Sequence, residues 1–200
     1  GRTFPRTHPD LLATVAMLFG MAPAPPGRCR VLELGCAGGA NLIAMAEGLP
    51  GSDFLGIDLS ARQVASGMER VRAKRLANVE LRPMNILDVG KDFGRFDYIV
   101  CHGVYSWVPA DVRDKILAVC GANLAPQGAA YVSYNCYPGW HAWGMVREMM
   151  AFHARRSDDP TECVRLAREF LGFATASVAD TDGVVGRILR EESELLARVP

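Results

Sequence analysis

The sequence has no excess of charge of either sign and no long apolar run. Its 200 residues include 22 basic and 22 acidic side chains, and no stretch concentrates lysine or arginine. A chain without a basic patch gives no electrostatic reason to expect binding to nucleic acid or to a membrane surface. No apolar run reaches the roughly 20 residues that a transmembrane helix needs. We therefore expect no nucleic-acid partner and no membrane segment.

Closely spaced metal ligands and cysteine pairs are also missing. No histidine has a partner of the H-x-x-x-H kind, so we expect no metal site, and Ser106 lies on no G-x-S-x-G turn. The six cysteines form no C-x-x-C pair, and several lie in apolar stretches. Free thiols in a reducing compartment are the simplest account, which predicts a cytoplasmic location. The cysteines are Cys29, Cys36, Cys101, Cys120, Cys136 and Cys163.

The N-terminal segment has two interpretations. Arg2 and Arg6, an apolar stretch at 11–21 and the triplet Ala-Pro-Ala at 22–24 imitate a secretory signal. The larger apolar side chains nevertheless fall on one helical face rather than all round, and Pro9 suits a first helical turn. We therefore favour an amphipathic helix. Its apolar positions are Leu11, Leu12, Val15, Leu18 and Phe19.

The most informative stretch covers residues 30–42, Arg-Val-Leu-Glu-Leu-Gly-Cys-Ala-Gly-Gly-Ala-Asn-Leu. An apolar run ends in a turn of small residues, and an apolar helical pattern follows. This pattern predicts a strand, a tight loop and a helix start, the unit that holds a nucleotide-like ligand at the carboxyl end of a parallel strand. Small residues let the backbone turn sharply and let a ligand approach its N–H groups. Glu33, inside the strand, suits a ligand with a positive amino group such as S-adenosylmethionine.

Strand and helix patterns alternate along the first two thirds of the chain. A helix from about 60 to 76 follows the second strand. Ser60 and Gln63 make a capping box at its start, and Gln63 is also within reach of a ligand there. Pro109 opens a further helix at its first position. Strands separated by helices imply a parallel sheet covered on both faces. The later predicted strands are 53–59, 79–84, 96–101 and, after a turn at 126–128, 129–134.

Two polar residues lie at the carboxyl ends of the second and third predicted strands. Asp58, 19 residues after Gly39, can accept hydrogens from both hydroxyls of a ribose; the plainer interpretation is a carboxylate at a helix entry. NAD-binding proteins use the same geometry, but the loop here does not make G-x-G-x-x-G, which argues against an NAD-dependent oxidoreductase. Asn85 can hydrogen-bond an adenine amino group while the Ile86 backbone reads the ring edge, or it is a plain turn residue.

Two groups of aromatic and polar side chains follow the fourth and fifth predicted strands, at 102–109 and 134–143. Ligands bind at the carboxyl ends of strands in open α/β sheets, and aromatic faces there favour a sulfonium or an alkylammonium by cation–π attraction. The plainer interpretation is that many of these rings pack the later helices onto the sheet. The candidate catalytic residues are His102, Tyr105 and Trp107, and His102 or Tyr105 is the candidate base for an amine acceptor.

Four segments together resemble a bacterial class I methyltransferase family whose members carry a methyltransferase domain followed by a methyltransferase regulatory domain. The segments are 32–37 (Leu-Glu-Leu-Gly-Cys-Ala), 56–60 (Gly-Ile-Asp-Leu-Ser), 102–108 (His-Gly-Val-Tyr-Ser-Trp-Val) and 134–141, which holds Tyr-Asn and Pro-Gly-Trp-His. The likeness runs from about Phe4 to His153. The relatives include rickettsial protein-lysine methyltransferases that modify an outer-membrane protein.

The resemblance implies S-adenosylmethionine as the cofactor and an α/β fold, a doubly wound Rossmann-like class I methyltransferase sheet with a helical segment after the fifth strand. Ala37 is compatible with the family, whereas Ala40 departs from the glycine expected there. The candidate cofactor-binding residues are Glu33, Gly35, Cys36, Ala37, Gly39, Asn41, Asp58, Leu59, Gln63, Asn85, Ile86 and His102.

The domain organisation changes near residue 140. Three helical segments follow, near 140–156, 161–178 and 184–198, and no further strand pattern returns. We expect residues 1–139 to form the S-adenosylmethionine-binding core, incomplete because its sixth and seventh strands are not found, and residues 140–200 to form a helical insertion or lid. The chain begins at Gly1 rather than Met, so we expect it to be a fragment, or the ordered part, of a longer protein.

The expected function is S-adenosylmethionine-dependent methyl transfer, with a protein lysine as one acceptor. A small-molecule O- or N-methyltransferase is an open alternative, because neither the acceptor atom nor the size of the substrate is readable from the residues. A second alternative is a non-catalytic cofactor-binding module that acts through a partner.

Overall fold

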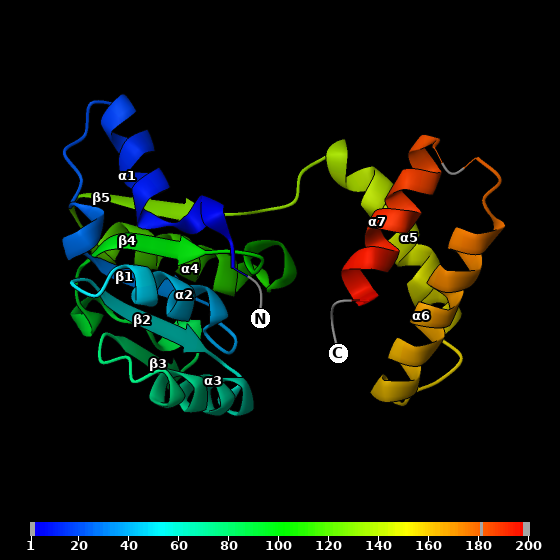
Figure 1. Ribbon diagram of the computed structural model, residues 1–200, viewed down its shortest axis with the longest axis horizontal. Coiled ribbons are helices and arrows are strands. Elements are labelled where there is room, and N and C mark those ends of the chain that lie inside the picture. Colours follow the sequence, from blue (N-terminus) through cyan, green and yellow to red (C-terminus); the bar gives the residue numbers. More distant parts are fainter. Residues whose placement is uncertain (1–2, 181, 198–200) are drawn as a thin grey trace. The chain divides into compact units, whose positions relative to one another are not determined.

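The computed structural model describes residues 3–180 and 182–197 and divides the chain into two compact units, Gly1–Tyr134 and Asn135–Pro200 (Figure 1). The predictions that fall on Gly1, Arg2 and residue 198 lie outside the described residues.

The first unit is built on a five-stranded sheet in the order β3-β2-β1-β4-β5, and every neighbouring pair is parallel. This confirms the predicted parallel sheet. A helix or a longer connection lies between consecutive strands, as parallel pairing requires. The strands are β1 Arg30–Leu34, β2 Asp53–Asp58, β3 Val79–Pro83, β4 Phe96–Cys101 and β5 Leu124–Val132.

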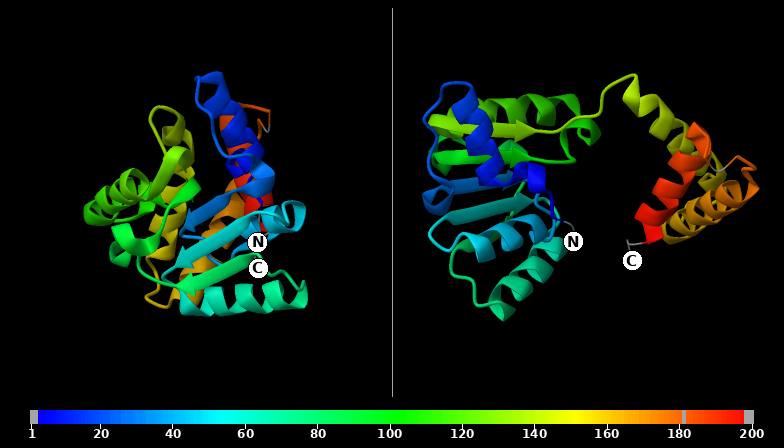
Figure 2. Two further views of the ribbon diagram at one scale, coloured as in Figure 1. Left: turned by 90° about the vertical axis from the view of Figure 1, so that its left-hand side faces the viewer. Right: turned by 45° about the horizontal axis from the view of Figure 1, so that its top comes forward.

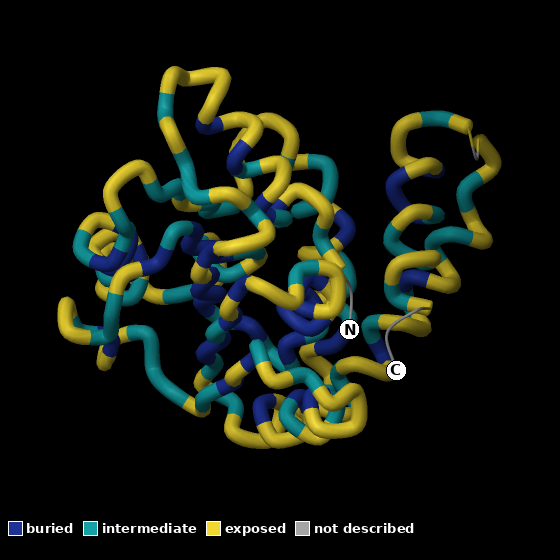
Figure 3. The backbone as a smooth tube through the Cα atoms, turned by 60° about the vertical axis from the view of Figure 1, so that its left-hand side comes forward, coloured by how far each residue is buried: buried dark blue, intermediate teal, exposed yellow. Residues whose placement is uncertain are grey.

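Helices cover both faces of this sheet (Figure 1). One apolar cluster joins strand residues to α1, α2 and α3, and a second joins the opposite strand residues to α4. In Figure 3 the buried backbone segments run through the middle of the unit, as expected for strands covered on both faces. The helices are α1 Pro9–Leu18, α2 Ala40–Gly48, α3 Ala61–Ala73 and α4 Ala110–Asn123. Short 3-10 turns are η1 Pro5–Thr7, η2 Pro26–Arg28, η3 Ile86–Asp88, η4 Lys91–Phe93 and η5 Tyr105–Trp107.

The N-terminal helix α1 buries only part of the apolar face predicted for it. An apolar helical face normally turns to the core, yet Leu18 and Phe19 are 81% and 82% exposed. The helix buries Ala13 and Ala16 instead. Small side chains let its backbone approach the sheet closely. Leu12 packs partly buried against the same apolar cluster, whereas Leu11, Val15 and Leu18 are exposed.

Two element boundaries also differ from the predictions. The fifth strand begins at Leu124 rather than at residue 129, and the predicted turn at 126–128 lies within it as an irregularity. Gln127 there has a left-handed backbone (φ +66°), so the extra residues bend the strand without ending it. Pro109 is the N-cap of α4 and not its first helical residue.

The start of α3 confirms half of the predicted capping box. The Ser60 side chain accepts a hydrogen bond from the Gln63 backbone N–H (3.4 Å), which caps the helix. The Ser60 N–H, however, donates to Asp58 Oδ1 (2.8 Å). A carboxylate two residues before the N-cap has thus taken the place that the Gln63 side chain fills in a complete capping box.

In the part that the structure describes, the second unit has three helices with a small core of their own, seen in the right-hand view of Figure 2. They are α5 Gly139–Ala154, α6 Pro160–Ser177 and α7 Val184–Ala197, close to the predicted ranges. Val146, Leu171, Ile188 and Leu189 form the core. No strand follows β5 in the described part of the chain. The role of this unit as an insertion or a lid stays a prediction.

None of the helices, within the residues that the structure describes, combines the length and the apolar character needed to cross a membrane.

Candidate active site

The loop between β1 and α2 turns through alternate residues with a left-handed backbone. Gly35, Ala37 and Gly39 have φ values of +74°, +52° and +68°. The N–H groups of Gly35 and Cys36 donate to the Ile57 carbonyl at the end of β2 (2.9 and 3.0 Å). The loop is therefore fixed at the carboxyl ends of two neighbouring strands, and the predicted strand, tight loop and helix start are confirmed. Ala40, where glycine was expected, is the first residue of α2.

Gly35 is a position of the loop that has no room for a side chain. A Cβ there would lie 2.5 Å from Val104 Cγ2, and its backbone is left-handed. We expect Gly35→Ala to lower the free energy of unfolding by at least about 2 kcal/mol, since left-handed strain and overpacking add. Urea denaturation measures the change. The matched control is Gly48→Ala at the end of α2, where a Cβ meets nothing within 4 Å; an equal loss in both variants would contradict a special role for Gly35.

Asp58, the last residue of β2, links the loop to the next helix. Its Oδ2 accepts the Ala37 N–H and its Oδ1 accepts the Ser60 N–H, both at 2.8 Å. Asp58 is therefore a carboxylate at a helix entry, as the plainer interpretation predicts. A carboxylate has about four lone-pair sites, and Asp58 is only partly buried. Two acceptor sites remain for a ligand, in an orientation that the two backbone bonds hold fixed.

Apolar and polar groups surround Asp58 at this edge of the sheet. Leu59, the next residue, is 76% exposed, so it offers an apolar surface beside the carboxylate. The N–H of Met84, after β3, donates to the Asp58 carbonyl (2.9 Å), which brings Asn85 close to Asp58. Asn85 Oδ1 accepts the Leu87 N–H (3.0 Å) and caps η3. This is the turn role; a contact of Asn85 or Ile86 with adenine stays a prediction.

Glu33 of β1 is buried, 4% exposed, and only one of its oxygens has a partner. Oε1 accepts a hydrogen bond from Asn41 Nδ2 (3.0 Å), whereas Oε2 has none among the described residues. Burial raises the pKa of Glu33 to about 7, against the opposing effect of the Asn41 hydrogen bond. A buried carboxylate with a free oxygen is costly unless a cation or donor meets it. It is the feature expected of a site for a positive group.

Asn41, in the first turn of α2, is nearly fully buried and bonds to three other residues. Its Nδ2 donates to Glu33 and to Thr7 Oγ1 (3.0 and 2.9 Å), and its Oδ1 accepts the Phe4 N–H (3.0 Å). Asn41 thus positions Glu33 and anchors the N-terminal segment. Its direct contact with a ligand stays a prediction.

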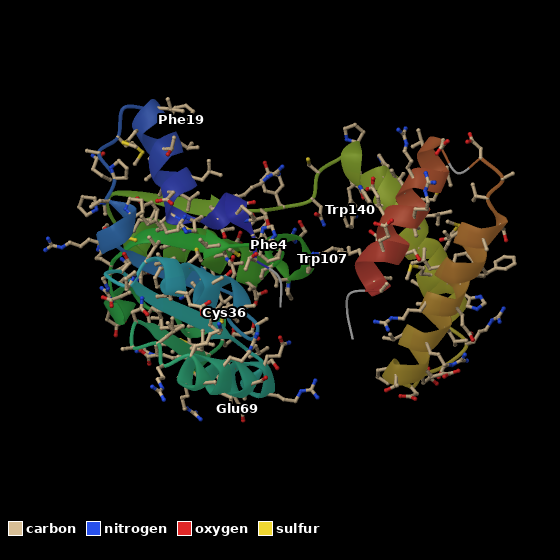
Figure 4. All side chains as sticks on the ribbon, viewed as in Figure 1. Phe4, Phe19, Cys36, Glu69, Trp107 and Trp140 are labelled. Carbon is tan, nitrogen blue, oxygen red and sulfur yellow. The ribbon has the colours of Figure 1, made fainter. Side chains whose placement is uncertain are left out.

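The structure places the three candidate catalytic residues just after β4, which neighbours β1. The strand order reverses between these two strands, and ligands in open α/β sheets bind at such a point. His102 lies against the ring of Phe4, with centroids 4.0 Å apart, and burial lowers its pKa. Tyr105 lies 6.4 Å from Tyr134, and Trp107 is 51% exposed (Figure 4).

Two cofactor candidates differ in how far they are open to a ligand. Gln63 is exposed on α3, near the loop that Arg70 of the same helix holds through a hydrogen bond to the Gly38 carbonyl. Cys36 is buried, and burial raises the pKa of its thiol to about 12. The thiol therefore stays protonated and fills space beside Gly56 rather than acting as a nucleophile.

Phe4, Thr7 and Arg70 were not identified from the sequence. Phe4 and Thr7 reach Asn41 over 37 and 34 residues of chain, and no local pattern signals so distant a contact. Arg70 falls on a helix rich in exposed polar residues, and its sequence spacing does not distinguish it from its neighbours.

Comparison with known proteins agrees with this geometry. Residues 32–130 match the family model described as a methyltransferase domain. An uncharacterized protein of Rickettsia prowazekii, RP028, is 40% identical over 195 residues, which are 98% of this chain and 78% of the relative. A second, RP789, is 41% identical over 96% of this chain and 35% of its own length.

A solved structure is similar over almost the whole chain. PKMT2 from Rickettsia typhi in complex with AdoHcy matches with a TM-score of 0.80 and 41% identity, and the match covers 99% of this chain and 38% of that one. The chain therefore spans little more than a third of PKMT2 and of RP789. The matched model, the identity to these relatives and the sheet order together show that this chain belongs to the class I S-adenosylmethionine-dependent methyltransferases.

Proposed function

We propose that the protein transfers the methyl group of S-adenosylmethionine to the side-chain amine of a lysine in a protein. The observation that carries the cofactor half of this proposal is the buried Glu33, whose Oε2 lacks a partner in the described part of the structure, beside a loop held by Asp58. The acceptor half, a lysine in a protein, is supported by the 41% identity to the rickettsial protein lysine methyltransferase PKMT2, a match that covers nearly the whole of this chain.

The residues at the carboxyl edge of the sheet fit this cofactor. Glu33 would face its positive amino group, and the free acceptor sites of Asp58 would take its ribose hydroxyls. Leu59, Asn85 and Ile86 would meet the adenine. When bound, S-adenosylmethionine supplies a methyl group that its sulfonium activates.

A lysine acceptor must lose a proton before it can react, because its ordinary pKa is about 10.4. His102 is suited to take that proton, since burial lowers its pKa and so keeps the imidazole neutral at physiological pH. Tyr105 is the second candidate. Trp107, half exposed, offers an aromatic face to the lysine stem and its charge.

The base is identified by two substitutions in the complete protein, His102→Ala and Tyr105→Phe. Removing a general base typically costs a hundredfold or more in rate, so we expect a loss of that size for the residue that takes the proton, with the affinity for S-adenosylhomocysteine retained. Mass spectrometry of methylated lysines in a lysine-rich protein substrate measures the rate.

His153→Ala is the matched control, because His153 lies on α5 against Phe170, and should leave the rate unchanged. Full activity of both variants would remove His102 and Tyr105 from the reaction. Methylation of small amines or hydroxyls alone would replace lysine by a small-molecule acceptor, and cofactor binding without any turnover would favour the non-catalytic module.

We also propose a cytoplasmic location in a bacterial cell. All six cysteines are free, and Cys29, Cys36, Cys101 and Cys120 are buried, which is typical of proteins in a reducing compartment. The relatives RP028 and RP789 are bacterial. We further propose that the protein carries the methyltransferase regulatory domain that the resemblance implies.

A further inference from the structure

The N-terminal segment Phe4–Thr7, which we name the strap, is tied by polar contacts to Asn41 in the first turn of α2, directly after the loop that follows β1. Thr7 is fully buried; its hydroxyl donates to the Phe4 carbonyl (2.8 Å) and accepts from Asn41 Nδ2 (2.9 Å). The Phe4 N–H donates to Asn41 Oδ1 (3.0 Å). Both ends of the strap are thus fixed to one side chain, which also bonds to Glu33.

The fixed strap presents Phe4 to His102. The ring centroids are 4.0 Å apart and the planes are tilted by 49°. A second ring, that of Tyr131 on β5, lies 5.9 Å from the imidazole. Figure 4 shows Phe4 at the same end of the sheet as Trp107. Phe4 lies 98 residues before His102, so this cover comes from a segment far away in the sequence.

The backbone beside His102 is fixed from the β5 side. The Gly103 N–H donates to Ser133 Oγ (2.8 Å) and the Ser133 N–H donates to the Cys101 carbonyl (3.0 Å). These bonds hold the residues before and after His102, so the orientation of the ring itself depends on what packs against it.

We propose that Phe4 is a positioning residue that fixes the orientation of the His102 imidazole and excludes water from it. Thr7 and Asn41 hold Phe4 in this position through their hydrogen bonds. The role in methyl transfer rests on the proposed function; the packing role does not. Phe4 carries no titratable group, and the one such group facing His102 from β5 is the Tyr131 phenol. Glu33 reaches the strap only through Asn41. Water exclusion is therefore the means by which Phe4 acts on His102, and burial is the cause of its lowered pKa.

The test is a proton NMR titration of the His102 ring in the protein without cofactor, assigned with His102→Gln. In Phe4→Ala water reaches the ring, so we expect the pKa of His102 to rise toward the ordinary value of histidine. Phe4→Tyr keeps the ring and should restore the wild-type titration. Thr7→Val, which keeps the shape and removes the hydroxyl, should shift it in the same direction as Phe4→Ala.

The matched control is Phe19→Ala, which should leave the titration unchanged, since Phe19 is 82% exposed at the C-cap of α1. In the methylation assay the acid limb of kcat/KM should move to higher pH in Phe4→Ala and in Thr7→Val, and should stay in place in Phe4→Tyr and Phe19→Ala. An unchanged His102 titration in both Phe4→Ala and Thr7→Val would overturn the positioning role. A wild-type protein that does not bind S-adenosylhomocysteine would refute the proposed function instead, and the titration would still decide the role of Phe4.

Discussion

Replacing Asp58 with alanine should weaken the binding of S-adenosylhomocysteine by about a hundredfold or more. Hydrogen bonds to a charged group contribute about 1.5–3 kcal/mol each, and Asp58 has two free acceptor sites for a ribose diol. Losing both costs at least about 3 kcal/mol, which corresponds to a factor of about 100 in affinity. The loop loses its support as well, because the Ala37 N–H and the Ser60 N–H both donate to this carboxylate.

The matched control is Asp53→Ala, at the opposite end of the same strand, where the side chain is exposed. Isothermal calorimetry should give the wild-type affinity for this variant. Asp58→Asn compares the support of the loop with the binding of the ribose. The amide keeps one acceptor oxygen, and its NH2 group only donates, so it can no longer accept the Ala37 and Ser60 N–H groups on separate oxygens. Wild-type affinity in Asp58→Ala would show that the ribose is held elsewhere.

Glu33→Gln should make the protein more stable at pH 8 and weaken its binding of the cofactor. The pKa of Glu33 is raised from 4.5 to about 7 in the folded protein, so between these values the folded state binds more protons than the unfolded state. The stabilising contribution of the protonated group is complete below about pH 4.5 and is lost as the pH rises through about 7. The difference between these two pKa values corresponds to about 3 kcal/mol in the free energy of unfolding.

Glutamine is neutral at every pH, so the variant lacks this loss. Between pH 5 and pH 8 the free energy of unfolding, measured with denaturant, should fall by about 2.5 kcal/mol more in the wild type than in Glu33→Gln. The control is Glu69→Gln, on the exposed side of α3 (Figure 4), which should follow the wild type. Identical pH dependence in all three proteins would contradict a strained, ionisable Glu33.

The same substitution removes a negative charge from the site of the cofactor's amino group. Binding of a positive group beside Glu33 favours its ionised form, so wild-type binding should release a proton near pH 7, and Glu33→Gln should release none. A residue that costs stability in the free protein and is needed by the ligand is typical of functional sites.

The sheet and its loop could be predicted from the sequence because their signals are local. Apolar runs separated by helical patterns specify parallel strands, and the small residues at 35–39 correspond to the alternating left-handed backbone of Gly35, Ala37 and Gly39. Asp58 was identified because its distance from the loop is set by the helix and strand between them.

What the sequence could not predict depends on packing between distant segments. The apolar pattern of α1 suggested one face, but the helix buries only part of that face and packs Ala13 and Ala16 closely on the sheet. The polar contacts of Asn41 with Phe4 and Thr7 exist only once the N-terminal segment lies against α2. The bend at Gln127 likewise reads as a turn in isolation and becomes part of a strand only beside β4.

The central claim, that the loop after β1 and the carboxylates of Glu33 and Asp58 form an S-adenosylmethionine site, is tested most directly by calorimetric titration of the wild-type chain. S-adenosylhomocysteine and NAD are compared at the same pH. The account predicts micromolar binding of S-adenosylhomocysteine, with release of a proton near pH 7, and no heat of binding with NAD. Binding of NAD in place of S-adenosylhomocysteine would contradict it.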